Sequence, residues 1–495
     1  MLADTPAEIQ VGAEQSAAFA RLSGDYNPLH LDPVAARRTS FGGTVVHGIH
    51  LLLAALDATA NSWARDGLAP AGIAVTFNSP VHTGVKLRIL LQDRAPENLR
   101  LIGQIGRRAA FSANITLNGS RSGDVDQADI GNNRRIAAAH CLDPVECELA
   151  APRDVDFPPD ISSAEIPLRL APRLLSTLFP ALGRLRRVGW IADLLATTRL
   201  VGMECPGANS IYSGCKLRRN DSQVGPNPLS LRYLVEQCDE RFRSVRLAVT
   251  GCELSGTVDA LFRPSPVAQQ SLREVAERVA PDSFSGQHAL VIGGSRGLGE
   301  LTAKLILGGG GDVTLTYSHG RDDAEGIRTE ARTLGRTCIV KHLDVRAEPL
   351  PEWVAAPFSH VYFFASPPIP RNVTGRWDHE LFGRLEAVYV RAFATVAQVV
   401  LSARARTRPP VFVYPSSILL TRHENGFAEY CVAKAAGEAL CDQLAYRHGA
   451  VFAHPRLPRM RTDQTSSVAA ADVEDSFRVM HDLLRALRRP VPDSG

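Results

Sequence analysis

The run Ala289-Leu290-Val291-Ile292-Gly293-Gly294-Ser295-Arg296-Gly297-Leu298-Gly299 joins a short apolar strand to a glycine-rich turn, and residues 301–307 continue it as a helix. Glycines in such a turn let the backbone approach a pyrophosphate, and the helix amino end adds free N–H groups and a favourable dipole. From residue 288 onward, strand-like and helix-like segments alternate. Such alternation is typical of a parallel sheet with right-handed crossovers, so we predict a doubly wound α/β domain over residues 285–495.

Three polar residues lie downstream of the glycine-rich turn. Tyr430 and Lys434 stand four residues apart in a predicted helix, so both side chains lie on one face. The nearby cation is expected to lower the phenol pKa from about 10, which lets Tyr430 exchange a proton with a substrate oxygen. Ser417, after the predicted strand 411–414, can hydrogen-bond the same oxygen. Together these residues predict a proton-transfer site beside a nicotinamide.

Through this turn and these residues, the segment 287–465 resembles the short-chain dehydrogenase/reductase family. The resemblance implies a Rossmann fold in which the three polar residues are catalytic. The predicted second strand, 313–318, ends without an acidic residue for a ribose 2′-hydroxyl, whereas Arg296 lies nearby, so NADP(H) is the expected cofactor. The expected cofactor-binding residues are Gly293, Ser295, Arg296, Gly297, Leu298, Gly299, Ser318, Asp344, Val345, Ala365, Tyr430 and Lys434.

The chain departs from this family at several positions. Phe364-Ala365-Ser366 replaces the family's Asn-Ala-Gly, and Tyr389 stands where the helix asparagine of the proton relay is expected. Pro455-Arg456 replaces a Pro-Gly pair, and a helical pattern at 476–484 stands where a last strand would follow. These changes affect the proton relay, the nicotinamide pocket and the usual dimer contact. We therefore expect a slower reductase, since the asparagine only resupplies protons.

Near the amino terminus, the run Ser23-Gly24-Asp25-Tyr26-Asn27-Pro28-Leu29-His30 places a carboxylate and an imidazole five residues apart. Moving water across a carbon–carbon double bond beside a carbonyl requires one group for the proton on the α-carbon and another for the hydroxyl. Asp25 would act as the base and His30 as the acid, with Asn27 as an orienting amide. Gly48, at the start of a predicted helix over 45–63, would donate its backbone N–H to the enolate-like oxygen.

A helix followed by a strand meander is predicted twice in the first half of the chain. The runs 19–33, 46–49 and 77–84 resemble the MaoC-like, (R)-specific enoyl-CoA hydratases of the hot-dog fold. That resemblance implies that Asp25 and His30 form the catalytic dyad, with Asn27 as helper and Gly48 as oxyanion donor. The second repeat resembles the same fold through 202–207 and 210–213 but has no matching dyad, so its expected role is to shape an acyl tunnel.

The predicted fold class is therefore an α+β double hot-dog followed by an α/β Rossmann domain of the short-chain dehydrogenase type. The expected domains are 1–122, the catalytic MaoC-like hot-dog; 123–270, the second hot-dog repeat; and 285–495, the dehydrogenase/reductase domain. This division agrees with the chain length of 495 residues, which is too long for one core.

The composition limits the partners of the chain. Its 55 basic and 52 acidic residues give a net charge of +3 without charged blocks, which does not indicate nucleic acid binding. The nine cysteines form no C-x-x-C pair, which favours reduced thiols in a cytoplasmic protein, and the scattered histidines predict no metal site. The first residues show the pattern of neither a secretory signal nor a transit peptide. No run approaches the about 18 apolar residues of a membrane span, so no membrane span is expected.

Together, the two resemblances imply a bifunctional enzyme acting on an acyl-CoA or acyl carrier protein thioester. Its NADP(H)-dependent site would reduce a 3-oxoacyl group, and its dyad would dehydrate the resulting 3-hydroxyacyl thioester. The same sites run backwards would hydrate and oxidise, as the resemblance to peroxisomal multifunctional enzymes suggests, although their domain order is reversed. A second alternative is a hydratase with a catalytically silent reductase domain that senses cofactor or serves assembly. A homodimer is compatible with either interpretation.

Overall fold

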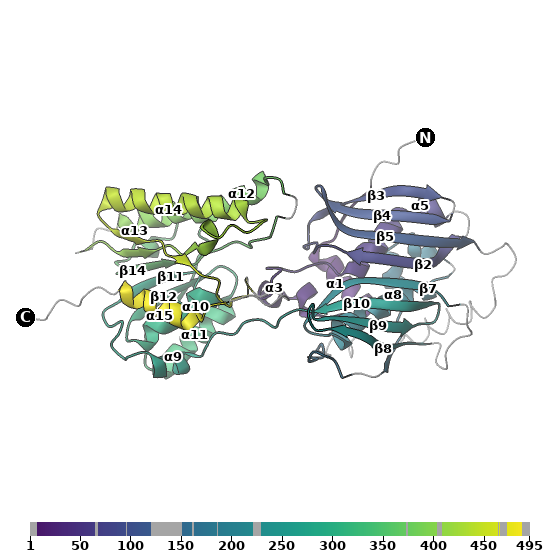
Figure 1. Ribbon diagram of the computed structural model, residues 1–495, viewed down its shortest axis with the longest axis horizontal. Coiled ribbons are helices and arrows are strands. Elements are labelled where there is room, and N and C mark those ends of the chain that lie inside the picture. The colour runs from purple at the N-terminus through teal and green to yellow at the C-terminus, as the bar shows by residue number, and fades with distance from the viewer. Residues whose placement is uncertain are drawn as a thin grey trace, which may run out of the picture. The chain divides into compact units, whose positions relative to one another are not determined.

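In the computed structural model, the chain divides into two units, one reaching to Ser265 and the other starting at Pro266. We call them unit 1 and unit 2; they run from purple to teal and from teal to yellow in Figure 1. The predicted boundary at 122/123 falls in a segment outside the described residues. The structure describes residues 7–64, 68–95, 97–119, 151–160, 163–185, 187–220, 229–372, 375–402, 408–463, 465 and 473–487.

Unit 1 contains one ten-stranded sheet in the order β1-β3-β4-β5-β2-β7-β10-β9-β8-β6. Its first half comprises β1 (Ala7–Gln10), α1 (Ala13–Ser23), α2 (Pro28–Leu31), α3 (Pro33–Arg37), α4 (Gly48–Ala58), α5 (Ala60–Trp63), β2 (Leu68–Phe77), β3 (Lys86–Ala95), β4 (Asn98–Ile105) and β5 (Arg108–Gly119). Its second half comprises β6 (Ala164–Pro167), α7 (Pro172–Leu178), the 3₁₀ turn η3 (Leu182–Arg184), α8 (Gly189–Arg199), the π-helical turn η4 (Leu200–Glu204), β7 (Ser210–Arg219), β8 (Ser230–Asp239), β9 (Ser244–Thr250) and β10 (Leu254–Phe262).

The two halves of unit 1 repeat one strand order. Counted inward to the central antiparallel pair β2–β7, the first half reads β1-β3-β4-β5-β2 and the second reads β6-β8-β9-β10-β7. Helices α4 and α8 occupy equivalent places in the order of elements of these halves, each before a meander of strands. Buried side chains from both halves form one continuous hydrophobic cluster. The predicted repeat of helix and meander is therefore present, within a single core.

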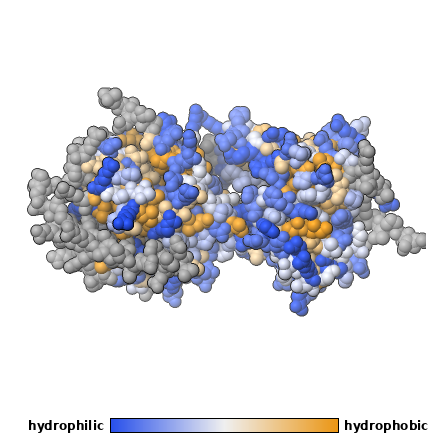
Figure 2. Space-filling view, turned by 180° about the vertical axis from the view of Figure 1, so that it is seen from behind, coloured by the Kyte–Doolittle hydropathy of each residue, from blue (hydrophilic) through white to orange (hydrophobic). Residues whose placement is uncertain are grey.

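The sequence explains these elements locally. Helix α4 is apolar nearly all round, as expected of a helix that packs on every side, and Ile49, Leu52 and Leu56 are fully buried. It ends at Ala58, so the predicted helix 45–63 is in fact two helices that meet at Thr59. The predicted strands of both halves are present in the structure. In β4 and β9, buried apolar residues alternate with more exposed residues, as expected of strands that cover a core on one face. In Figure 2, hydrophobic side chains lie in groups among hydrophilic ones on the visible face.

Unit 2 contains a six-stranded parallel sheet in the order β13-β12-β11-β14-β15-β17, which is a doubly wound topology. One hydrophobic cluster packs α9, α10, α11 and α15 on one face, and another packs α12, α13 and α14 on the other (Figure 1). Within the described residues, the only strand after β17 is the two-residue β18, which pairs with β16 in a separate sheet and does not extend the six-stranded one. The predicted carboxyl-terminal helix is α15. The elements are α9 (Leu272–Arg278), β11 (His288–Ile292), α10 (Gly297–Gly308), β12 (Asp312–Tyr317), α11 (Arg321–Thr333), β13 (Cys338–His342), η5 (Glu352–Ala355), β14 (His360–Phe363), α12 (His379–Glu386), the π-helical η6 (Ala387–Ala392), α13 (Phe393–Leu401), β15 (Val411–Val413), β16 (Ser416–Ser417), η7 (Ile418–Leu420), α14 (Ala428–His448), β17 (Val451–Ala453), β18 (Arg456–Leu457) and α15 (Ser476–Ala486).

Among the described helices, none combines the length and apolar character needed to cross a bilayer.

Candidate active sites

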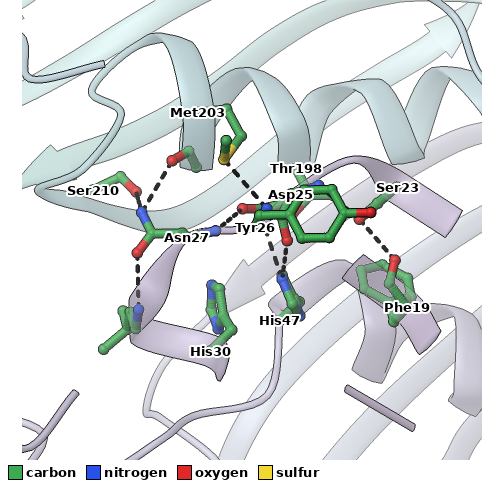
Figure 3. Close-up of polar contacts among 12 residues, drawn as sticks. Phe19, Ser23, Asp25, Tyr26, Asn27, His30, His47, Thr198, Met203 and Ser210 are labelled. Carbon is green, nitrogen blue, oxygen red and sulfur yellow. Dashed lines mark hydrogen bonds and ion pairs between the residues drawn. The ribbon is translucent and has the colours of Figure 1, made fainter. Parts of the chain in front are cut away.

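Asp25 lies in the interior of unit 1, directly after α1. Gly24 ends that helix in a left-handed conformation, with φ of 76°, and this turn directs the next residue inward. The Asp25 carboxylate accepts hydrogen bonds from the Thr198 hydroxyl at 2.9 Å and from the Asn27 backbone N–H at 3.2 Å (Figure 3). Only 1% of its surface is exposed, so nearly all of its solvation comes from the protein.

His30 lies on α2, whose first turn Asn27 caps by accepting the Leu29 N–H at 3.0 Å. Its Nδ1 is 2.7 Å from the Val45 carbonyl oxygen, so Nδ1 carries a proton and neutral His30 has an unprotonated Nε2. A ring nitrogen of His30 and a carboxylate oxygen of Asp25 lie within 4.8 Å of each other. A water molecule that hydrogen-bonds to both groups, at about 2.8 Å each, spans such a gap.

Asn27 connects the dyad to the second half of unit 1. Its side-chain N–H₂ donates to the Gly202 and Gly207 carbonyls, each at 3.0 Å, and lies 3.4 Å from the Ser210 hydroxyl (Figure 3). The side chain is fully buried and both of its ends are occupied. In this geometry Asn27 holds α2 in place, and its orienting role in catalysis stays a prediction.

The second half of unit 1 also holds Asp25 itself. A Cβ added to Gly202, in the π-helical turn η4, would stand 2.1 Å from the Asp25 carboxylate, so only glycine fits there. Thr198 on α8 supplies the hydroxyl that Asp25 accepts. The sequence suggested only a tunnel-shaping role for this repeat, and it missed both residues because they lie more than 170 positions from Asp25.

The internal repeat carries a signal that could have identified Thr198. Thr198 lies nine residues after Gly189, the first residue of α8, and Asp57 lies nine residues after Gly48, the first residue of α4. Asp57 accepts the backbone N–H groups of Ala181 and Leu182 at 2.8 and 2.9 Å. Equivalent positions on the two helices thus hold the loop of the opposite half.

Burial sets the protonation of the dyad. It raises the pKa of Asp25, with His30 and the hydrogen bond from Thr198 acting in the opposite direction. It lowers the pKa of His30, which Asp25 opposes. Both directions favour an uncharged pair, in which Asp25 carries a proton and neutral His30 has no proton on Nε2.

His47 completes the surroundings of the dyad. Its Nε2 lies 3.1 Å from the Asp25 backbone carbonyl, and its ring stacks on the His30 ring with centroids 3.7 Å apart. Burial lowers the pKa of His47 well below its usual range. Asp25, His30 and His47 therefore form a three-residue group of potential metal ligands, which the sequence did not predict.

Gly48 is the first residue of α4, as predicted. Its N–H has no acceptor within the helix and points out of the positive end of the helix dipole. A Cβ here would lie 2.7 Å from the Phe77 ring, so the close packing requires glycine. Because the preceding residue, His47, contacts Asp25, the helix end and the dyad are adjacent.

In unit 2, the glycine-rich turn lies between β11 and α10, as predicted. Gly293 and Gly297 have φ of 74° and 58°, and a Cβ on Gly299 would stand 2.4 Å from the Gly293 carbonyl oxygen. This tight turn at a helix amino end fits the phosphates of a dinucleotide. The remaining expected cofactor contacts follow the carboxyl ends of neighbouring strands: Ser318 after β12, Asp344 and Val345 after β13, and Ala365 after β14. Ser295 and Leu298 lie in the turn and in the first turn of α10.

Arg296 and Asp344 already have protein partners. The Arg296 guanidinium lies 3.1 Å from the Asp463 carboxylate, which also accepts the Val267 N–H. Asp344 forms a two-pronged hydrogen bond with Arg346. A 2′-phosphate on Arg296 would therefore have to share that cation with Asp463.

The structure brings Ser417 and Tyr430 together but isolates Lys434. Burial raises the pKa of Tyr430 to about 12, and only a hydrogen bond with Ser417 opposes it. The Lys434 ammonium donates to the Pro415 carbonyl at 2.7 Å and lies 3.9 Å from the Tyr389 ring centroid but 6.0 Å from that of Tyr430. The expectation that Lys434 lowers the Tyr430 pKa is therefore wrong in this geometry, because the lysine is enclosed elsewhere. Burial lowers the pKa of Lys434 to about 7.

Two of the departures from the family contact each other. The Tyr389 hydroxyl lies 2.6 Å from the Ser366 hydroxyl, and its ring is fully buried against Lys434. Tyr389 lies in the π-helical segment η6. An aromatic ring thus occupies the neighbourhood in which a proton relay through asparagine and lysine was expected.

Unit 1 thus has the geometry of an acid–base enzyme, with a buried carboxylate and imidazole beside a helix amino end. Residues 2–103 match the family model described as "MaoC like domain", and the amino-terminal part of the chain is a MaoC-like domain. The chain is 40% identical over 73 residues to the (R)-specific enoyl-CoA hydratase of Aeromonas caviae, covering 15% of this chain and 54% of that protein. It is 32% identical over 113 residues to the peroxisomal multifunctional enzyme type 2 of Drosophila melanogaster, covering 22% of this chain and 19% of that protein. The chain thus spans about half or less of the length of these relatives.

Solved structures of short-chain dehydrogenases are similar to part of the chain. One from Burkholderia cenocepacia, in complex with NADP, is 23% identical with a TM-score of 0.36, and the match covers 41% of this chain and 90% of that one. Another, from Salmonella enterica, is 18% identical with a TM-score of 0.37, covering 42% and 91%. The strand order of unit 2, rather than these low scores, defines its fold.

Proposed function

We propose that unit 1 catalyses the reversible addition of water to a 2-enoyl thioester, giving a 3-hydroxyacyl thioester. The observation that carries this proposal is the buried pair of Asp25 and His30, within 4.8 Å of each other beside the amino end of α4. The MaoC-like domain and the hydratase relative support the same chemistry.

The pair would work with a single shared proton. In hydration, the His30 Nε2 takes a proton from water as the oxygen attacks the β-carbon, and protonated Asp25 gives its proton to the α-carbon. In dehydration, carboxylate Asp25 removes the α-proton and His30 returns a proton to the leaving hydroxyl. The Gly48 N–H would stabilise the negative charge on the thioester oxygen in both directions. The uncharged pair favoured by burial is the form ready for hydration.

We propose that unit 2 is an NADP(H)-dependent oxidoreductase acting on the 3-oxoacyl or 3-hydroxyacyl thioester. The turn at Gly293, Gly297 and Gly299 would hold the cofactor phosphates, and the bound cofactor would supply or accept a hydride. Ser417 and Tyr430 would hold the substrate oxygen, and Tyr430 would exchange its proton. The shared intermediate would be the 3-hydroxyacyl thioester.

A second candidate is a hydratase whose unit 2 binds dinucleotide without turnover. The enclosure of Lys434 by Tyr389 and by the Pro415 carbonyl favours it, because the ammonium is not directed at Tyr430. Mass spectrometry of the protein with NADPH and 3-oxoacyl thioesters of several lengths, on coenzyme A and on acyl carrier protein, separates the two. Reduced and dehydrated products, with reduction lost in Tyr430→Phe, support the bifunctional enzyme. Binding of NADPH without consumption supports the silent domain.

The hydratase is tested separately with a 2-enoyl thioester in the absence of NADPH. Formation of the 3-hydroxyacyl product by the wild-type protein, lost in His30→Ala, is the expected result. Product formation of equal rate in that variant would overturn the assignment of the dyad.

A further inference from the structure

Arg263 is a buried cation close to the proposed hydratase site. It follows the last strand of unit 1, β10, and only 9% of its surface is exposed. Its Nη2 donates to the Ala208 carbonyl at 2.6 Å. Its Nε and Nη1 are also buried, yet they have no hydrogen-bond partner in the described part of the chain.

A buried guanidinium with two unpaired N–H donors lowers the stability of the folded protein unless a ligand compensates it. A buried charge without a partner is strongly destabilising, and buried guanidinium groups normally pair with carboxylates or phosphates. None of the ion pairs found among the described residues involves Arg263. The guanidinium therefore presents two unpaired N–H donors and an uncompensated positive charge, which together match the oxygens of an anion.

The position of Arg263 connects it to the dyad. The Ala208 carbonyl that accepts from Arg263 also lies 3.5 Å from the Asn27 side-chain nitrogen. Asn27 is the cap of α2, which carries His30. The charge of Arg263 is also felt at His30, where it contributes to the lowered pKa. An anion on Arg263 would thus lie beside the acid–base pair.

We propose that Arg263 binds an anionic oxygen group, a carboxylate or a phosphate, of the thioester substrate of unit 1. This inference rests on the proposed hydratase function and deepens it. Two parts of such a substrate could carry the group: a carboxylate on the acyl chain, or a phosphate of the coenzyme A or phosphopantetheine carrier. In either case the guanidinium would fix the substrate relative to Asp25 and His30.

Kinetics with three thioesters separate the two sources. They are 2-butenoyl-pantetheine, which carries no anion, 2-butenoyl-CoA, which adds the carrier phosphates, and 4-carboxy-2-butenoyl-pantetheine, which adds an acyl carboxylate. Loss of a charge-assisted hydrogen bond corresponds to roughly a 10- to 100-fold effect. In Arg263→Gln we expect the kcat/KM ratio of one anionic substrate to the neutral one to fall by that factor. The substrate whose ratio falls identifies the source.

Controls distinguish a binding role from a structural one. Arg232→Gln removes an exposed arginine of β8 in the same unit and should leave both ratios unchanged. Arg263→Lys keeps the charge without the forked donors and should lie between wild type and Arg263→Gln. Without added anion, Arg263→Gln should melt at or above the wild-type temperature, because it removes an uncompensated buried charge. If neither ratio changes in Arg263→Gln, the proposal is overturned.

A binding measurement on the full chain keeps the proposal independent of turnover. Glutarate and inorganic phosphate are titrated while the melting temperature is followed. Saturable stabilisation of the wild type that is lost in Arg263→Gln supports an anion site, even if no thioester is hydrated and the proposed function fails. Equal responses of the two proteins to both anions would refute the site, even if hydration is observed.

Discussion

Thr198→Val tests whether the second half of unit 1 controls Asp25, the proposed catalytic carboxylate. The substitution keeps the shape of the side chain and removes the hydroxyl that donates to Asp25 at 2.9 Å. A hydrogen bond to a charged group contributes about 1.5–3 kcal/mol, so its loss should raise the pKa of Asp25 further. The uncharged pair becomes still more favoured, and the carboxylate form is disfavoured.

The kinetic consequence has a definite sign. In hydration the uncharged pair becomes the charged pair, and in dehydration the reverse occurs. The equilibrium constant between the 2-enoyl and 3-hydroxyacyl thioesters does not depend on the enzyme. The kcat/KM values for hydration and dehydration must therefore fall by the same factor, which we expect to be about tenfold or more. Because Asp25 would keep its proton to higher pH, the alkaline limb of the pH–rate profile should shift to higher pH.

The assay follows 2-butenoyl-CoA hydration and 3-hydroxybutyryl-CoA dehydration across pH, with Thr198→Ser as the rescue. Thr59→Val is a matched control, since the Thr59 hydroxyl donates only within its own helical region, to the Ala55 and Leu56 carbonyls. A folded Thr198→Val protein with kcat/KM within twofold of wild type and an unmoved alkaline limb would refute the reasoning. Loss of rate that serine does not rescue would indicate a packing role instead.

Four further predictions concern other parts of the molecule. Asp25→Asn should keep the contacts of the site but reduce hydration roughly 10²- to 10⁴-fold, and near-normal turnover would contradict the dyad. Arg296→Ala should narrow a preference for NADPH over NADH in calorimetry, and equal dissociation constants in wild type would overturn that preference. Tyr389→Asn should increase NADPH consumption with a 3-oxoacyl thioester, whereas no increase would show that Tyr389 does not restrain Lys434. Asp193→Ala leaves three backbone N–H groups without their carboxylate acceptor and should lower the free energy of unfolding by about 3 kcal/mol or more in urea titrations. A loss of less than about 1 kcal/mol would show that water replaces the carboxylate as acceptor.

Local patterns predicted the framework of both units. The glycine-rich turn and the alternation after residue 288 were sufficient for the doubly wound sheet, because those signals depend on neighbouring residues. The start of α4 at Gly48 and the meanders of unit 1 were also confirmed. Spacing within one helix correctly placed Tyr430 and Lys434 on α14.

The failures are contacts between distant segments. Helical spacing cannot reveal that the rings of Tyr389 and Tyr414 lie next to the Lys434 ammonium, since both come from other elements. The same holds for Thr198 and Gly202 against Asp25. Burial is the largest cause of the shifted pKa values of Asp25 and Lys434, and it depends on packing between segments far apart in the sequence. The residue types were therefore predictable while the directions of their pKa shifts were not.

The unequal halves of unit 1 explain why one dyad serves two repeats. Where Thr198 donates a hydroxyl to the Asp25 carboxylate, its counterpart Asp57 is itself a carboxylate and accepts backbone N–H groups from the opposite loop. A second acidic residue placed in that loop would meet Asp57 with like charge, which is unfavourable at this partly buried position. In the proposed hydratase, one half would supply the acid and the base. The other half supplies the hydroxyl, the glycine and the carbonyls that hold them. The proposed catalytic unit is therefore the pair of repeats, although the proposed acid and base lie in only one.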